Sequence, residues 1–237
     1  MQRTEQVLPY PLPYALLKFG EEQHIQALRT DGLLYMRPLA EFAKMESDMA
    51  RGDSFEATTR IIQPKHVGEL IFDTGSVGLG KFTAQPSDLA GPVRFKLNKT
   101  ASCDVYCMFA VTKPIDGELV SSKNFEFGTS CVIVLNTAEF LSRVIRAAKD
   151  HGVSCLEWGL VEYYNADEYS GEIGRFRKRS MFDYQNEFRI VAEPGSHAPR
   201  TLPVGSLLDI TSEVLPLSEI NWRFDFSTKS AREAGIY

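Results

Sequence analysis

The stretch Lys178-Arg-Ser-Met-Phe-Asp-Tyr-Gln-Asn-Glu-Phe-Arg-Ile-Val191 carries charges where a buried strand would normally carry apolar residues. Side chains alternate between the two faces of a strand, so Gln185, Glu187 and Arg189 are predicted to share one face. The apolar residues between them, Phe188 and Ile190, then point the other way, into a core. The pattern predicts a functional face opposite a buried one.

Two simpler interpretations of this region stay open. Glu187 and Arg189 also suit a cross-strand ion pair on a solvated sheet face, which is a common fate of charges at alternating strand positions. The basic run Arg175–Arg179 just before them suits a solvated turn. Its interleaved Phe176 and the nearby Tyr184 would equally suit base stacking in a nucleic-acid site.

Outward from this stretch, several segments show the patterns of regular elements. Nearly unbroken apolar runs at 105–112 and 128–135 predict central strands covered on both faces. Asn136 is placed to cap a helix that ends near His151-Gly152, with Glu139 at the capping-box position. At the start of the chain, we expect a strand, a helix, a strand and a short second helix at 15–19, 21–30, 33–36 and 38–45.

The remaining segments are less regular. Residues 63–98 are rich in Gly and Pro and are interpreted as a long active-site loop or a mobile insertion. The C-terminal part is predicted to be rich in strands around 206–210 and 221–226. Helices that are few and early, with many late strands, predict a single α+β domain over 1–237 with curved, mostly antiparallel sheets.

Composition limits the classes of function. The chain has 237 residues, with 31 acidic and 26 basic side chains and a net charge of −5, which argues against broad electrostatic binding to nucleic acid. None of the four cysteines forms a C-x-x-C pair, so buried thiols in a reducing compartment are expected. No segment resembles a signal peptide or a membrane span, so we expect a cytoplasmic protein with no membrane partner.

The Gln185-Asn-Glu187 spacing suggests a specific chemistry. Cleavage of the nicotinamide–ribose bond of NAD needs a carboxylate that holds a ribose hydroxyl and stabilises a developing oxocarbenium ion. We expect Glu187 to be that catalytic carboxylate and Gln185 to orient the acceptor. The histidines and cysteines lack the spacing of a metal site, so no metal is expected in this reaction.

The same triplet resembles the Q-x-E motif of ADP-ribosyltransferases. Phe127-Gly-Thr-Ser130, at the opening of a central strand, resembles their aromatic-Ser-Thr-Ser motif, and the order of the two motifs agrees. These enzymes carry an Arg or His on the first strand to hold NAD, where this chain has Lys18. The resemblance implies an ADP-ribosyltransferase-like fold with NAD as donor substrate, contacted by Lys18, Tyr35, Arg51, Ser130, Tyr184 and Arg189.

A closer resemblance is to a widespread bacterial family of unknown function, over about residues 15–210. Its members carry an Asp-x-Phe-Glu loop, like Asp53-Ser-Phe-Glu56, and a Lys...Tyr-[Glu/Gln]-x-Glu-[aromatic]-Arg-Ile motif. Lys178 and the segment from Tyr184 to Ile190 match that second motif. Such domains look like toxins or phage-defence effectors, which implies a neutralising partner protein. We expect Asp53, Glu56, Arg177 and Lys178 to contact the substrate.

Three hypotheses follow. The first is an ADP-ribosyltransferase-like enzyme that transfers ADP-ribose from NAD to a macromolecular acceptor, either nucleic acid or protein. The second is a metal-dependent nuclease in which Asp53, Glu56 and Glu187 bind Mg²⁺ and Lys178 contacts the phosphate. The third is a non-catalytic module whose polar face binds a nucleotide or a partner protein.

Overall fold

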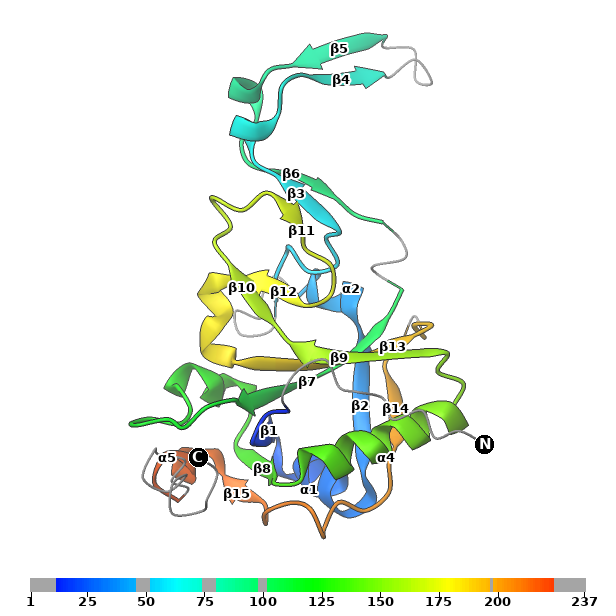
Figure 1. Ribbon diagram of the computed structural model, residues 1–237, viewed down its shortest axis with the longest axis vertical. Helices are drawn as coiled ribbons and strands as arrows, with labels where there is room; N and C mark the ends of the chain where they lie inside the picture. The colour runs from blue at the N-terminus through cyan, green and yellow to red at the C-terminus, as the bar shows by residue number, and fades with distance from the viewer. Residues whose placement is uncertain (1–11, 46–51, 74–79, 98–101, 197, 224–237) are drawn as a thin grey trace.

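The computed structural model describes residues 12–45, 52–73, 80–97, 102–196 and 198–223. It is an α+β structure in which nearly all strand pairs are antiparallel (Figure 1). The α-helices are α1 (Glu22–Asp31), α2 (Leu39–Phe42), α4 (Thr137–Asp150) and α5 (Ile220–Arg223). The 3₁₀ helices are η1 (Pro64–His66), η3 (Pro86–Asp88), η4 (Ser122–Phe127), η5 (Ser180–Gln185) and η6 (Leu217–Glu219).

An eight-stranded sheet forms the body of the molecule. Its strands follow the order β14-β2-β7-β1-β8-β15, and β13 and β9 extend it from a second edge of β7. These strands are β1 (Ala15–Gly20), β2 (Leu33–Pro38), β7 (Asp104–Val111), β8 (Ser130–Val134), β9 (Cys155–Leu160), β13 (Glu187–Glu193), β14 (Arg200–Pro203) and β15 (Leu215–Pro216).

Helices α1 and α4 cover one face of this sheet and bury the larger core. Ile25 and Leu28 of α1 and Phe140 and Val144 of α4 pack with Ile190 and other apolar residues of the sheet. The predicted cap of α4 is confirmed, because the Asn136 side chain accepts a hydrogen bond from the Glu139 backbone N–H at 3.0 Å. The apolar side chains of α4 recur at helical spacing, so they lie on one side of the helix and pack against the apolar face of the sheet.

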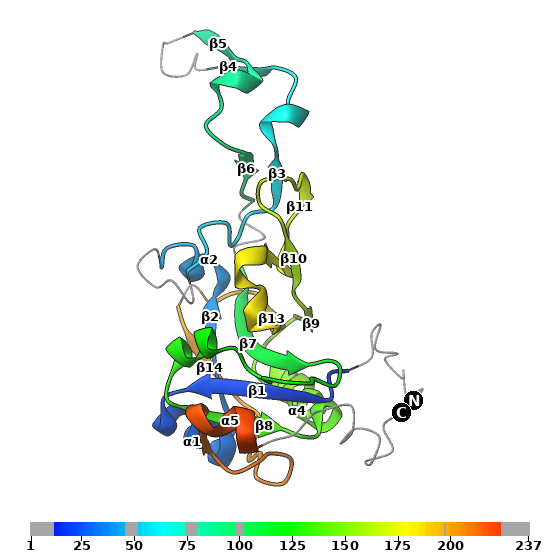
Figure 2. The same cartoon turned by 90° about the vertical axis from the view of Figure 1, so that its left-hand side faces the viewer.

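Strand β7 is the point where the sheet divides. It pairs with β13 over Asp104–Phe109 along one edge, and its other edge pairs with β2 only at Asp104 and Val105 and with β1 only from Phe109 to Val111. Between these two ladders, no described strand pairs with this edge. Strands β1 and β2 leave β7 in different directions (Figure 2). We call the region between these two strands, beside the unpaired part of the β7 edge, the fork.

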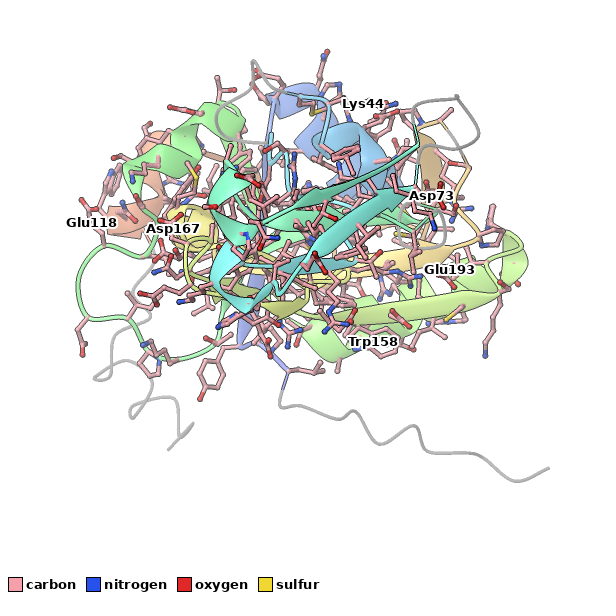
Figure 3. All side chains as sticks on the ribbon, turned by 90° about the horizontal axis from the view of Figure 1, so that it is seen from above. Lys44, Asp73, Glu118, Trp158, Asp167 and Glu193 are labelled. Carbon is pink, nitrogen blue, oxygen red and sulfur yellow. The ribbon has the colours of Figure 1, made fainter. Side chains whose placement is uncertain are left out.

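The described residues of the segment 63–98, which are 63–73 and 80–97, form an arm of short strands and 3₁₀ helices, where the sequence suggested a long active-site loop or a mobile insertion. Its base is a small sheet of β3 (Arg60–Ile62), β6 (Val93–Phe95) and β11 (Gly171–Glu172), and its tip is the hairpin of β4 (Leu70–Asp73) and β5 (Lys81–Ala84). The arm projects away from the eight-stranded sheet in Figures 1 and 2 and is the part nearest the viewer in Figure 3. At the tip, the rings of Phe72 and Phe82 stack with centroids 4.7 Å apart, yet both side chains stay exposed.

The structure differs from two further expectations. Gln185 was predicted on the same strand as Glu187, but it ends η5, and Asn186 adopts a left-handed backbone conformation (φ 38°) before β13 begins. Residues 206–210 and 221–223 are not strands; the latter belong to α5, while 224–226 lie outside the described residues. The helices are few, as predicted, but they are not confined to the early part of the chain.

Two cysteines also depart from the expected burial. Cys103 and Cys131 are buried, whereas Cys155 is exposed and Cys107 is partly exposed; all four are free thiols. No helix in the described segments is long and apolar enough to cross a membrane.

The last small sheet pairs β10 (Glu162–Tyr164) with β12 (Arg177–Arg179) in parallel and holds the basic run beside β13.

We predict that the arm tip adds little to the stability of the body. Leu70 and Ala84 are paired, so a two-residue Asn-Gly turn can replace 71–83 without opening the rest of the arm. The melting temperature should change by no more than about 3 °C, while solubility rises because Ile71, Phe72 and Phe82 are removed from the surface. Differential scanning calorimetry and static light scattering measure both. A fall of ten degrees or more would show that the tip supports the body.

Candidate functional site

Four buried charged residues meet on the face of the sheet opposite α1 and α4. Glu187 and Arg189 of β13, Lys178 of β12 and Glu56 of the 52–58 segment are each at least nine-tenths buried. We call these four residues the charge cluster. Their two positive and two negative charges balance. Buried charges are tolerated in proteins when they are paired with opposite charges in this way.

Arg189 lies at the centre of the charge cluster. Its Nε donates to Glu187 Oε1 at 2.6 Å, and both of its terminal nitrogens donate to the Glu56 carboxylate. One of these nitrogens, Nη1, also donates to the backbone carbonyl of Arg175 at 2.6 Å. The planar guanidinium group thereby holds two carboxylates in fixed positions.

Lys178 links Gln185 to Glu187. Its Nζ donates to Gln185 Oε1 at 2.8 Å and to Glu187 Oε2 at 3.2 Å. The two residues of the Gln-x-Glu triplet therefore come together through a lysine from another strand rather than through strand alternation. The backbone N–H of Glu187 donates to the Tyr163 hydroxyl at 2.9 Å, which holds the start of β13 in place.

The pKa values of the two carboxyl groups in the charge cluster shift in opposite directions. Burial alone would raise the pKa of Glu187, but Arg189 and Lys178 outweigh it and hold this pKa well below its usual range. Burial raises the pKa of Glu56, and the attraction of Arg189 and Lys178 only partly offsets it. The difference follows from the geometry, since Lys178 Nζ is 3.2 Å from Glu187 and 3.9 Å from Glu56. Glu187 is therefore held in its ionised form more strongly than Glu56.

A cavity of about 790 Å³ opens over the charge cluster. All four cluster residues line it together with Gln185, and it extends through the fork between β1 and β2 to α1. Its apolar walls include four phenylalanines, Phe19, Phe42, Phe109 and Phe127, and its polar walls include Lys18, Arg37 and Asn124. This volume is within the range of cavities that bind cofactors and small ligands.

Lys18 lies in the fork between β1 and β2. Its Nζ donates to the Cys107 carbonyl oxygen at 2.7 Å and lies 4.3 Å from the centroid of the Tyr106 ring. The carbonyl belongs to the edge of β7 that the fork leaves without a ladder partner among the described strands. Lys18 thus satisfies a backbone acceptor that strand pairing does not reach, and it brings a positive charge to the cavity wall.

The structure brings most, but not all, of the predicted site residues to the cavity. Tyr35, like Lys18, Glu56, Lys178, Gln185, Glu187 and Arg189, lines it. Ser130, Asp53, Arg177 and Tyr184 do not, and Arg51 lies outside the described residues. Asp53 instead pairs with Arg179 at 2.7 Å, and Arg177 pairs with Glu162 at 2.8 Å. Ser130 pairs with Gly20 within the sheet.

The simpler interpretations are wrong for these residues. Glu187 and Arg189 do pair, but both are buried, so they do not form an ion pair on a solvated face. The basic run is not a solvated turn throughout either, because Arg177–Arg179 form β12 and each charge of the run is paired with a carboxylate. The pairs are Arg175 with Glu157 and Glu193, Arg177 with Glu162, Lys178 with Glu187, and Arg179 with Asp53.

Many residues of the cavity wall were not predicted from the sequence, among them Arg37, Cys107 and Asn124. Arg37 follows Leu33 and Tyr35 at alternating positions of β2, and this alternation was a usable signal. Cys107 and Asn124 gave no such signal, because they reach the cavity through the fork and through η4. Within the described segments, no group of three or more His, Cys, Asp or Glu side chains is arranged to hold a metal ion.

Comparisons with known proteins gave no relative. Neither a scan of protein-family models, nor a search of curated proteins, nor a search of solved structures found a match. The resemblances to ADP-ribosyltransferases and to the bacterial family of unknown function therefore stay predictions from motifs. The function has to be argued from the cavity itself.

We predict that Arg189→Met destabilises the protein by about 3–5 kcal/mol at pH 7, because it leaves two buried carboxylates with Lys178 as their remaining cluster cation. Chemical denaturation measures the loss. Arg60→Met is the matched control, since Arg60 and Glu172 are both more than half exposed and 3.9 Å apart. The control should cost less than about 1 kcal/mol. Equal effects of the two substitutions would contradict a structural role for the charge cluster.

We also predict a pH signature for Glu187. Its pKa is lowered from 4.5 in the folded protein, so its ionisation stabilises the fold above pH 4.5, and this contribution is lost as the pH falls below that value. The free-energy difference between wild type and Glu187→Gln should therefore be largest near neutral pH and shrink below pH 4.5. Urea titrations at several pH values measure it. A difference that grows on acidification would contradict an ionised Glu187.

Proposed function

We propose that this protein is an ADP-ribosyltransferase-like enzyme that binds NAD in the 790 Å³ cavity and transfers ADP-ribose to a macromolecular acceptor. The observation that carries the proposal is the ionised carboxylate of Glu187 at the floor of that cavity. Departure of nicotinamide leaves positive charge on the ribose, and a fixed anion beside it lowers the barrier.

The geometry around Glu187 suits this role. Each carboxylate oxygen already accepts from one cation, Arg189 at Oε1 and Lys178 at Oε2. A carboxylate has about four acceptor positions, and the Cys107 thiol occupies a third, so one is left for a ribose hydroxyl. Because its partners are themselves packed and hydrogen-bonded, Glu187 needs no reorganisation when charge develops on the substrate.

Gln185 lies beside Glu187, but its side chain is a neutral amide. Lys178 holds the Gln185 carbonyl oxygen, and the Gln185 amide nitrogen is 3.3 Å from the Tyr184 hydroxyl. An amide in this position can accept from or donate to an incoming acceptor without competing for the ribose. This arrangement supports the role of Gln185 in orienting the acceptor.

The other end of the cavity suits a pyrophosphate and a base. Lys18 and Arg37 supply positive charge, and Tyr35 on β2 offers an exposed ring beside Arg37. An aromatic face and two cations are the usual partners of an adenosine phosphate. By contrast, the carboxylates of the magnesium hypothesis are paired with cations, Asp53 with Arg179 and Glu56 with Arg189, so the geometry favours NAD over Mg²⁺.

We predict that Glu187→Asp lowers nicotinamide release from NAD by about 100-fold or more while preserving the charge balance of the cluster. Liquid chromatography of the reaction, with a cell extract as the source of acceptor, measures the release, and a melting curve checks the fold. Glu162→Asp is the matched control because Glu162 is exposed and pairs with Arg177 alone in the basic run. Its activity should equal that of wild type.

Several outcomes would contradict the proposed function. One is a folded Glu187→Asp variant that releases nicotinamide as fast as wild type. Another is a wild-type protein that neither consumes NAD nor melts higher in its presence, given that a ligand at 100 times its Kd stabilises by about 2.7 kcal/mol. Activity that EDTA abolishes would instead favour the metal-dependent hypothesis, and a melting shift without turnover would favour a binding module.

A further inference from the structure

A cysteine side chain lies between the charge cluster and the cavity. Cys107 is on β7, directly opposite Arg189 of β13, and it lines the cavity as a partly exposed residue. Its chain neighbours Tyr106 and Met108 are buried in the larger core beneath α1 and α4. Since side chains alternate between the two faces of a strand, the Cys107 thiol points to the opposite face, where Glu187 lies.

The Cys107 thiol forms a hydrogen bond with the Glu187 carboxylate. The two residues are diagonal neighbours in the antiparallel ladder, because Glu187 pairs with Phe109, and long side chains reach across such a diagonal. Burial raises the pKa of the thiol, so the thiol stays protonated and is the donor. An S–H group is a weak donor, whereas the other two donors to this carboxylate, Arg189 and Lys178, carry full positive charges. The thiol is therefore the partner that Glu187 gives up most easily.

These contacts leave Glu187 with two acceptor positions that a ligand can use. Of about four positions, the two cations hold two firmly, the thiol holds one weakly and one is open. The Glu187 side chain is 6% exposed, and the residue lines the cavity. Two hydroxyls on adjacent carbons of a ribose lie close enough together to donate to the two oxygens of one carboxylate. A ribose is therefore matched to both positions.

We propose that Cys107 is a specificity residue that selects a ligand with two adjacent hydroxyls, one donating to the open position of Glu187 and the other displacing the thiol. The inference rests on the proposed use of NAD and adds that both hydroxyls of the nicotinamide ribose are read. A ligand with one hydroxyl fills the open position and leaves the thiol in place. A stronger donor at position 107 competes with the second hydroxyl, and a side chain without a donor does not.

The test measures the binding of three ligands to the full chain by isothermal titration calorimetry. The first is carba-NAD, in which a methylene group replaces the ring oxygen of the nicotinamide ribose, so that the bond to nicotinamide is not cleaved and both hydroxyls remain. The other two lack the 2′-hydroxyl or the 3′-hydroxyl of that ring. Wild type should bind carba-NAD about tenfold more tightly than either deoxy form, because each of these donates one hydrogen bond fewer to a charged group.

Cys107→Ser should abolish this tenfold advantage. The serine hydroxyl is a stronger donor than the thiol and holds its position on Glu187 against the second hydroxyl, so carba-NAD binds about tenfold more weakly than to wild type. The two deoxy forms should bind the variant as tightly as wild type, because they do not need that position. A purely structural effect would weaken all three ligands by the same factor, and this result would overturn the inference.

Cys107→Ala removes the donor and makes the test independent of how well the serine variant folds. It should bind carba-NAD at least as tightly as wild type and keep the advantage over both deoxy forms; loss of the advantage would overturn the inference. Cys131→Ser is the matched control, since Cys131 is another thiol of the same sheet, buried on β8, that does not line the cavity. The advantage should persist in this control, and its disappearance there would also count against Cys107.

The remaining outcomes separate this inference from the proposed function. If wild type binds the three ligands equally, or binds none of them, the role of Cys107 is overturned, even if NAD is consumed. If the advantage of carba-NAD disappears only in Cys107→Ser, the role stands, even if NAD is never cleaved, and the failure then belongs to the proposed transfer reaction. Nicotinamide release from NAD, measured on the same preparation, decides between these cases.

Discussion

The contact between Arg189 and the two carboxylates of Glu187 and Glu56 constrains everything else at this site. Burying a charge costs several kcal/mol, and close, well-oriented partners are what offset the cost. Glu187 and Arg189 come from β13, Lys178 from β12 and Glu56 from the segment after α2. Three stretches must therefore be in place together, one of them 133 residues before Arg189, and a displacement of any one would leave a charge unpaired in the interior.

The same constraint accounts for the shape of the cavity. The ladder between β7 and β13 holds the charge cluster against one edge of β7, while β1 and β2 separate along the other edge. The space between them reaches from the cluster to α1, and Lys18 satisfies the exposed carbonyl of Cys107 within it. The Glu187 carboxylate is consequently rigid, whereas the walls that would meet a ligand are mostly apolar. Rigid charge beside apolar surface favours a transition state over a hydrated ion.

Sequence patterns predicted the elements whose signals are local. The apolar run of β7 and the Asn136 cap of α4 were recognisable because periodicity and capping depend on neighbours along the chain. Gln185 was misplaced because a left-handed Asn186 breaks the strand, and alternation alone does not reveal such a turn. Glu187, Arg189 and Lys178 were predicted as site residues with separate roles, and neither their mutual contact nor their burial was foreseen. Asn124 had no local signal, because its side chain is held by a hydrogen bond to the backbone of Tyr184, sixty residues away.

The arm and the charge cluster share one set of anchors. Arg94 of β6 and Arg179 of β12 lie on the Phe55 ring, each 4.9 Å from its centroid, and Arg179 also lies 5.5 Å from Phe182. Lys178 in turn lies 4.8 Å from the Phe182 ring. Cations and rings therefore alternate from the base of the arm to the cavity floor. Each contact is worth about 0.5–2 kcal/mol, depending on its burial. These contacts join the base of the arm to two members of the charge cluster, to Lys178 through Phe182 and to Glu56 through its chain neighbour Phe55.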